Sequence, residues 1–190
     1  MLVRSICRVR RTFALTLLAL FFSSPLEAAV LNIVAIGASN TSGFGVGAQD
    51  AYPAQLQVLL RKKGIPAKVT NAGVLGDTTT GMLRRLDNAT PKGTNIVILQ
   101  PGGNDLRFGF SKEQRAANIK AMVKRLRARD IRVIVFDPEI PPDYYQWDHI
   151  HFNAAAHAKI AAKLADEIAA GPIAQPAPPV IAEPPAPRQP

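Results

Sequence analysis

Short apolar runs alternate with helix-like segments through the middle of this 190-residue chain, and this alternation limits its possible folds more than any other feature. The apolar runs have the length and composition of buried strands and span residues 30–36, 67–71, 95–100 and 131–136. Apolar residues at helical spacing predict four helices, at residues 51–63, 79–86, 111–129 and 153–170. Strands separated by single helices imply right-handed crossovers, a parallel sheet and helices on both of its faces.

Two cap signals help to place the helix ends. Gly64 follows the first predicted helix and suits a left-handed C-terminal cap. Ser111 can cap the third helix, with Gln114 in the capping-box position. In parallel sheets of this kind ligands bind beyond the carboxyl ends of the strands, so we expect the chemistry in the segments that follow the four strands.

Each of these segments has an ordinary structural explanation when it is taken alone. Ser39 could cap a helix, and glycine, asparagine and aspartate are common turn residues. A serine becomes a nucleophile, however, when a base takes its proton and a carboxylate orients that base. Asp148 and His151 are three residues apart, so one short segment can deliver both groups to Ser39.

Together the segments resemble the four sequence blocks of the SGNH (GDSL-type) hydrolase family. The matching segments are residues 37–40, 69–78, 102–105 and 148–151, in that order. The resemblance covers nearly the whole folded unit and is closest to the thioesterase, lysophospholipase and arylesterase branch. The nucleophile elbow of ordinary α/β-hydrolases is not met, because Thr41 stands where its second glycine belongs.

The resemblance implies a serine hydrolase with a Ser-His-Asp triad and neither metal nor cofactor. Ser39 would be the nucleophile, His151 the base and Asp148 the group that orients the imidazole. The oxyanion hole would consist of the backbone N–H groups of Ser39 and Gly76 and the side-chain amide of Asn104. One such donor is typically worth about 3–4 kcal/mol of transition-state stabilisation.

Other polar residues are expected to have structural roles. His149 is the alternative base, but the family pattern selects His151. His157 lies within the last predicted helix and is expected to be a surface or packing residue. Asp105 is expected to order the loop at residues 102–104, and Asp77 and Asp143 to be turn or cap residues. The glycines at 43, 45 and 47 lack the spacing of a phosphate-binding loop.

Two departures from the family pattern have structural consequences. Ala38 occupies a position that is usually Asp in the family. Because this position is not part of the catalytic relay, we expect its change to affect local order more than activity. Only eleven residues separate Phe136 from Asp148, where relatives insert a helix and a fifth strand. The resemblance therefore implies a three-layer α/β/α sandwich with a parallel flavodoxin-like sheet of four strands, in order 2-1-3-4, without the fifth strand. Three aromatic residues in the short bridge either line an acyl or aryl pocket or cover the sheet edge: Tyr144, Tyr145 and Trp147.

The two ends of the chain differ from the middle. Residues 1–28 combine four arginines, an apolar run and small residues at a cleavage point, which predicts a secretory signal peptide, with an uncleaved anchor as the alternative. Residues 172–190 hold eight of the sixteen prolines, which predicts a disordered Pro/Ala-rich spacer or tether. The hydrolase domain is then residues 29–171, in an exported protein found in the periplasm or outside the cell.

The net charge of +9 limits the classes of partner. The basic residues of the middle follow helical spacing without interleaved aromatics, which favours a solvated surface over a nucleic-acid groove. Weak attraction to an anionic membrane surface or polysaccharide stays open. Cys7 is the one cysteine and lies in the predicted signal peptide, so an internal disulfide is excluded. We expect a monomer.

Three functions are consistent with these residues. The first is a secreted serine esterase that hydrolyses carboxylic ester or thioester bonds in a small molecule or lipid. The second is removal of acetyl groups from envelope or extracellular polysaccharide. The third is a catalytically silent module that binds the envelope or glycans. The complete set of implied site residues argues against this third function.

Overall fold

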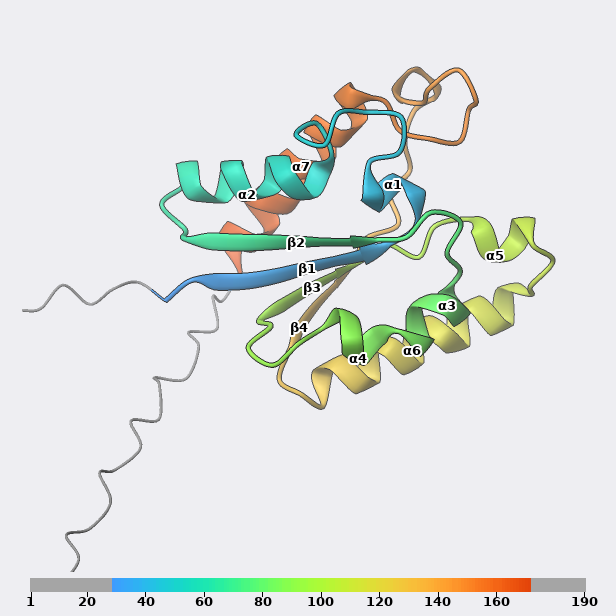
Figure 1. Cartoon of the computed structure of the whole chain (residues 1–190), viewed down its shortest axis with the longest axis horizontal. Helices are drawn as coiled ribbons and strands as arrows, with labels where there is room; N and C mark the ends of the chain where they lie inside the picture. Colours follow the sequence, from blue (N-terminus) through green and yellow to red (C-terminus); the bar gives the residue numbers. More distant parts are fainter. Residues whose placement is uncertain (1–28, 172–190) are drawn as a thin grey trace, which may run out of the picture.

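The computed structural model describes residues 29–171 and contains one parallel sheet (Figure 1). Its four strands are β1 (Leu31–Gly37), β2 (Ala67–Gly73), β3 (Ile96–Leu99) and β4 (Arg132–Val135). They pair in the order β2-β1-β3-β4, with every pair parallel. The predicted strand order is therefore confirmed. The predicted signal peptide and proline-rich tail lie outside the described residues.

Helices cover both faces of the sheet and make the predicted three-layer sandwich (Figure 1). One face carries α2 (Tyr52–Lys62) and α7 (Ala154–Ala170). The other carries α3 (Thr79–Arg84), α4 (Leu86–Ala89) and α6 (Lys112–Arg127). The helix predicted at residues 79–86 is thus two short helices. In residues 29–171 no helix is both long and apolar enough to cross a membrane.

The central strands divide the hydrophobic core into two clusters, one on each face. Strands β1 and β3 are buried almost throughout, because alternate side chains enter opposite clusters. Leu56 and Leu164 belong to the cluster under α2 and α7, and Met82 and Met122 to the cluster under α3 and α6. This packing holds the carboxyl ends of the strands at one end of the molecule.

Short elements occupy that end, at the right of Figure 1. They are α1 (Ser39–Ser42), α5 (Asn104–Arg107) and a 3₁₀ turn at Pro142–Tyr144, and the sequence pattern predicted none of them. Glycine lets α1 approach the strands closely. A Cβ at Gly37 would lie 2.0 Å from Thr41 Oγ1, and one at Gly73 would lie 2.2 Å from Ser42 N. The Thr41 hydroxyl then donates to Gln100 Oε1 at 2.6 Å, which joins α1 to the end of β3.

His157 of α7 is a buried packing residue. Its Nδ1 accepts a hydrogen bond from the backbone N–H of Tyr52 at 3.2 Å, and its ring centroid lies 6.2 Å from that of Tyr52 and 6.0 Å from that of Phe152. Burial lowers the pKa of His157 from 6.5 to about 4, although the charge of Asp50 opposes the shift. The ring is therefore neutral in the folded protein at neutral pH.

This burial predicts a loss of stability in mild acid. The unfolded chain takes up a proton at His157 below pH 6.5, whereas the folded chain resists protonation down to about pH 4. Stability is thus fully present above pH 6.5 and falls between these values, by about 2–3 kcal/mol from this group. We expect the free energy of unfolding, measured by chemical denaturation at a series of pH values, to depend less on pH in His157→Gln than in the wild type. Parallel curves for the two proteins would contradict this.

Candidate active site

Ser39 is the first residue of α1, directly beyond the end of β1. Its side chain is almost buried, and its carbonyl oxygen accepts hydrogen bonds from the N–H groups of Gly43 and Phe44, both at 3.1 Å. Ala38, where the family usually has Asp, gives α1 no side-chain cap, and its carbonyl oxygen instead accepts the N–H groups of Thr41 and Ser42. Backbone hydrogen bonds, together with one from the Ser42 hydroxyl to the Ser39 carbonyl oxygen at 2.8 Å, therefore set the start of this helix.

Asp148 and His151 form a close pair in the loop before α7. His151 Nδ1 lies 2.5 Å from Asp148 Oδ2, and Asp148 Oδ1 accepts the backbone N–H groups of Ile150 and His151, both at 3.0 Å. These donors lower the pKa of Asp148, the backbone N–H of His151 most and its imidazole next. The carboxylate stays ionised, and a carboxylate at this distance favours the tautomer that carries the proton on Nδ1 and leaves Nε2 of His151 as the acceptor.

Asn40 ties the serine segment to the histidine segment, a role that the sequence pattern did not indicate. Its Oδ1 accepts the N–H of Phe152 at 2.9 Å, and its Nδ2 donates to the carbonyl of Ile150 at 3.2 Å. The two bonds hold the backbone on either side of His151. In the described part of the chain, no hydrogen bond joins Ser39 Oγ directly to the imidazole. Hydrogen bonds of this kind often tighten only when substrate binds.

Gln146 and Phe44 reinforce this junction. The Gln146 amide donates to the carbonyl oxygens of Phe44 at 2.8 Å and Phe152 at 2.9 Å. Gly45 leaves room for it, since a Cβ there would lie 2.2 Å from Gln146 Oε1. The Phe44 ring in turn contacts the imidazole of His151, with centroids 4.5 Å apart. The one sign of these contacts in the sequence is the position of Gln146 within the bridge at residues 137–147.

Asn104 lines the same cavity as Ser39 and is held in place by the loop after β2. Its Nδ2 donates one hydrogen to the carbonyl oxygen of Asp77 at 2.8 Å. An asparagine amide has two hydrogens, so the second is available to a bound group. Gly76 lies in the same loop, at the third position of a turn closed by the N–H of Asp77 and the carbonyl oxygen of Val74. Its φ of +72° suits glycine at this turn position.

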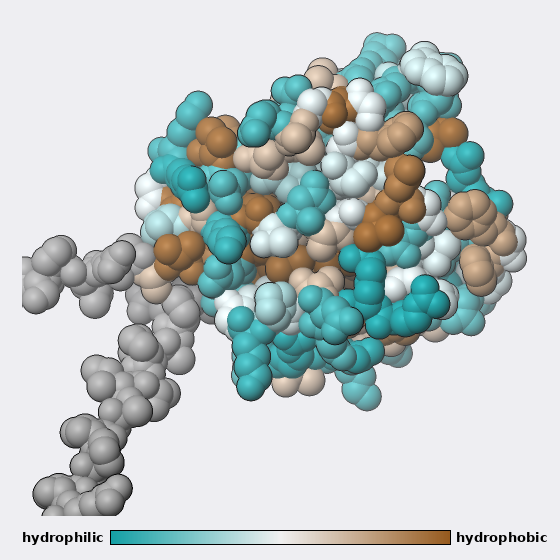
Figure 2. All heavy atoms as spheres, viewed as in Figure 1, coloured by the Kyte–Doolittle hydropathy of each residue, from teal (hydrophilic) through white to brown (hydrophobic). Residues whose placement is uncertain are grey.

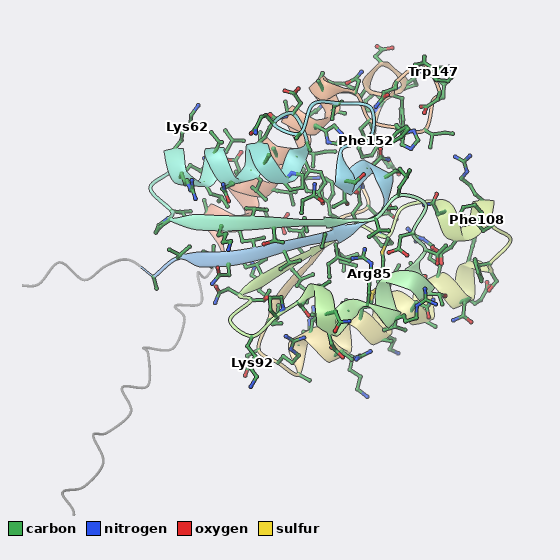
Figure 3. The ribbon with its side chains drawn as sticks, in the orientation of Figure 1. Lys62, Arg85, Lys92, Phe108, Trp147 and Phe152 are labelled. Atoms are coloured by element: carbon green, nitrogen blue, oxygen red, sulfur yellow. The ribbon has the colours of Figure 1, made fainter. Side chains whose placement is uncertain are left out.

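The acidic residues nearby have structural roles, as the sequence indicated for Asp77 and Asp105. Asp105 is fully buried and accepts the backbone N–H and the hydroxyl of Thr79, which fixes the loop before Asn104 to α3. Asp77 pairs with Arg85, which is labelled in Figure 3, at 2.7 Å, and Arg85 also donates to the carbonyl oxygen of Gly37. These contacts hold the loops after β1, β2 and β3 together.

A cavity of about 460 Å³ opens beside Ser39. Ser39 and Asn104 line it together with charged, polar and apolar groups, among them Arg107, Arg115, Asp137, Tyr145, Ile150 and Phe152. Gly76, Asp148 and His151 are not part of its lining, so the cavity extends from the serine on the side of α5 and β4. His149 does line it, with φ of +55°, a backbone conformation that is uncommon for histidine.

The three aromatic residues of the bridge have three different surroundings. Tyr145 lines the cavity, and its ring also packs edge-on against Phe152. Tyr144 packs against the core cluster below α7, where Lys159 lies over its ring. Trp147 does neither, since it is 89% exposed. Within residues 29–171, no three His, Cys, Asp or Glu side chains gather as metal ligands.

Proteins of known activity are similar to this chain. Esterase TesA of Pseudomonas aeruginosa is 29% identical over 119 residues, which cover 62% of this chain and 59% of that protein. An arylesterase of Vibrio mimicus is 27% identical over 134 residues, which cover 68% of this chain and 66% of the relative. The chain thus spans about three fifths to two thirds of the length of these relatives.

Solved structures show the same fold. A crystal structure of TesA superimposes with a TM-score of 0.66 at 22% identity, over 72% of this chain and 97% of that one. AlinE4, described as an SGNH-hydrolase family esterase, superimposes with a TM-score of 0.54 at 29% identity, over 72% of this chain and 73% of that one.

The family assignment rests on most of the described domain. The sequence model of the GDSL-like Lipase/Acylhydrolase family matches residues 35–178, a range that contains all four blocks at the strand ends. The structural neighbours have the fold that the blocks implied. The chain therefore belongs to the GDSL-like lipase/acylhydrolase family, the SGNH hydrolases.

Proposed function

We propose that this protein is a serine esterase that hydrolyses carboxylic ester or thioester bonds through Ser39, His151 and Asp148. The observation that carries the proposal is the junction made by Asn40. It ties the backbone around the hydrogen-bonded Asp148–His151 pair to the segment that presents Ser39 to the cavity. Similar proteins named esterase, arylesterase and thioesterase 1/protease 1/lysophospholipase L1 support this class of reaction.

The reaction begins when Ser39 Oγ attacks the carbonyl carbon of the ester. His151 Nε2 takes the hydroxyl proton, and the ionised Asp148 stabilises the imidazolium that forms. The same proton then passes to the leaving alcohol or thiol as the tetrahedral intermediate breaks down to an acyl-serine. Water, activated by the same imidazole, attacks the acyl group and restores Ser39.

Three donors would stabilise the oxyanion of the intermediate: the backbone N–H groups of Ser39 and Gly76 and the free amide hydrogen of Asn104. The bond from Asn104 to the carbonyl of Asp77 fixes the amide before substrate arrives. A donor that is already oriented costs no reorganisation during the reaction, which is why such groups accelerate acyl transfer. Gly76 lies in the same turn as Asp77, so one loop positions both groups.

The cellular setting is part of the same proposal. Residues 1–28 would direct export and be removed, and residues 172–190 would serve as a spacer. The esterase would then act in the periplasm or outside the cell, as a monomer and without metal or cofactor. Deacetylation of polysaccharide and silent binding are the competing functions, and the assays below separate them.

Replacement of the serine tests the nucleophile. We expect Ser39→Ala to lower kcat on short p-nitrophenyl esters at least about a thousandfold, because the remaining residues cannot form the acyl intermediate. His151→Ala should have a similar effect. His149→Asn is the matched control, since asparagine tolerates the positive φ at this position, and it should change kcat by less than tenfold.

The result of this assay also separates the competing functions. Serine-dependent release of acetate from acetylated sugars, with little turnover of aryl or thioesters, would favour the polysaccharide deacetylase. Turnover that survives in Ser39→Ala would contradict the proposed nucleophile. A wild-type protein without turnover and without reaction with a fluorophosphonate would favour the binding module.

Removal of the Asn104 amide tests the oxyanion hole. We expect Asn104→Ala to lower kcat by about 100- to 1000-fold, since the amide bonds to charge that develops only in the transition state. KM should change little, because the ground-state carbonyl gains less from the same donor. Steady-state kinetics on a soluble ester measure both values. A raised KM with an unchanged kcat would assign Asn104 to substrate binding instead.

A further inference from the structure

The backbone just before Asn104 has few contacts of its own. The buried Asp105 anchors the chain on the other side of Asn104, but Gly102 and Gly103 have no side chains to pack. Beyond its chain neighbours, a Cβ would have no atom closer than 3.9 Å at Gly102 and none within 4 Å at Gly103. Glycine also has the greatest backbone freedom of any residue, so this segment needs another contact to hold it.

Arg115 of α6 supplies that contact. Its Nε donates to the carbonyl oxygen of Gly102 at 3.2 Å. In the described part of the chain, no other group donates to that oxygen, and no other side chain bonds to the backbone of residues 101–103. The same guanidinium donates through Nη2 to Asp137 Oδ2 at 2.7 Å, in the bridge beyond β4. One side chain thus joins α6 to the segments that follow β3 and β4.

The surroundings of Arg115 differ from those of an ordinary surface arginine on the same helix. The side chain of Arg115 is 21% exposed and lines the cavity beside Ser39. The side chain of Arg125 is 48% exposed and pairs with the exposed Asp87. The surface over α4 and α6 is mainly hydrophilic in the space-filling view, as expected for solvated helix faces (Figure 2). Arg115 therefore stands apart, because its guanidinium bonds to the loops at the strand ends.

We propose that Arg115 is a positioning residue for the oxyanion hole, which holds the amide of Asn104 in place through the backbone of Gly102. The inference rests on the proposed function, because it assigns a role in that reaction. A guanidinium donates in fixed directions within one plane, so the bond to Asp137 keeps Nε directed at Gly102. The carbonyl of Asp77 orients the amide itself, and Arg115 fixes the backbone from which that amide extends.

Arg115→Met tests this role, since methionine keeps much of the aliphatic stem and removes both donors. We expect kcat on a soluble p-nitrophenyl ester to fall about 10- to 30-fold, which is part of the loss expected when the Asn104 amide itself is removed. KM should change less than about twofold, because the ground-state carbonyl gains less from that amide. Titration with a fluorophosphonate gives the concentration of reactive sites, so partial unfolding does not lower the measured kcat.

Three further variants grade the effect. Arg115→Lys has a single donor atom that cannot reach both acceptors, so its kcat should lie between those of the wild type and Arg115→Met. Asp137→Asn leaves the bond to Gly102 in place, and because Asp137 is 54% exposed we expect kcat to fall less than about threefold. Arg125→Met is the matched control, since it removes an ion pair of the same helix, and its kcat should equal that of the wild type.

A double-variant cycle with Asn104→Ala separates positioning from a general loss of structure. If Arg115 acts through the Asn104 amide, Arg115→Met should lower kcat by less than about twofold once that amide is absent. An equal loss of kcat in both backgrounds would overturn the proposal, and so would a wild-type kcat in Arg115→Met. A raised KM with an unchanged kcat would assign Arg115 to substrate binding instead.

The NMR spectrum of the free protein gives a second readout that does not require turnover. We expect the side-chain amide signals of Asn104 to shift and broaden in Arg115→Met and to match the wild type in Arg125→Met. Unchanged Asn104 signals in Arg115→Met, in a protein that hydrolyses esters, refute only this inference. Changed signals in a protein without turnover keep Arg115 as the residue that positions Asn104 and refute only the proposed esterase.

Discussion

The candidate site depends on the two hydrogen bonds of Asn40, because they join segments from opposite ends of the domain. Asn40 and its partners are separated by 110 and 112 residues along the chain. The sheet brings these segments to the same end of the molecule. Asn40 binds the backbone on both sides of His151, and Gln146 and Phe44 support the same junction.

The sequence was sufficient for the frame of the fold. Strand and helix patterns are local, so the apolar run at Ile96–Leu99 and the cap at Ser111 were readable without a structure. The strand order and the implied site came from the resemblance of the four blocks. The contacts of Asn40, Gln146 and His157 were not predictable, because each depends on a partner far along the chain or on burial.

The short bridge between β4 and α7 shapes the surroundings of the site. Without a fifth strand, β4 forms the edge of the sheet, and Val135 stays half exposed. The bridge instead folds over the end of the sheet, where Tyr145 lines the cavity and Trp147 extends into solvent. The short bridge thus contributes Asp137, Pro138 and Tyr145 to the wall of the cavity beside Ser39.

The rate at which a fluorophosphonate labels Ser39 tests the central claim most directly. It measures the reactivity of the hydroxyl and does not require the preferred substrate to be known. We expect Asn40→Ala to react about a hundredfold more slowly than wild type with its fold intact, since small displacements of catalytic groups cost this much. Asn40→Asp, which keeps the acceptor for Phe152 and loses the donor to Ile150, should fall between them. Labelling of folded Asn40→Ala at the wild-type rate would show that the asparagine does not hold the site together.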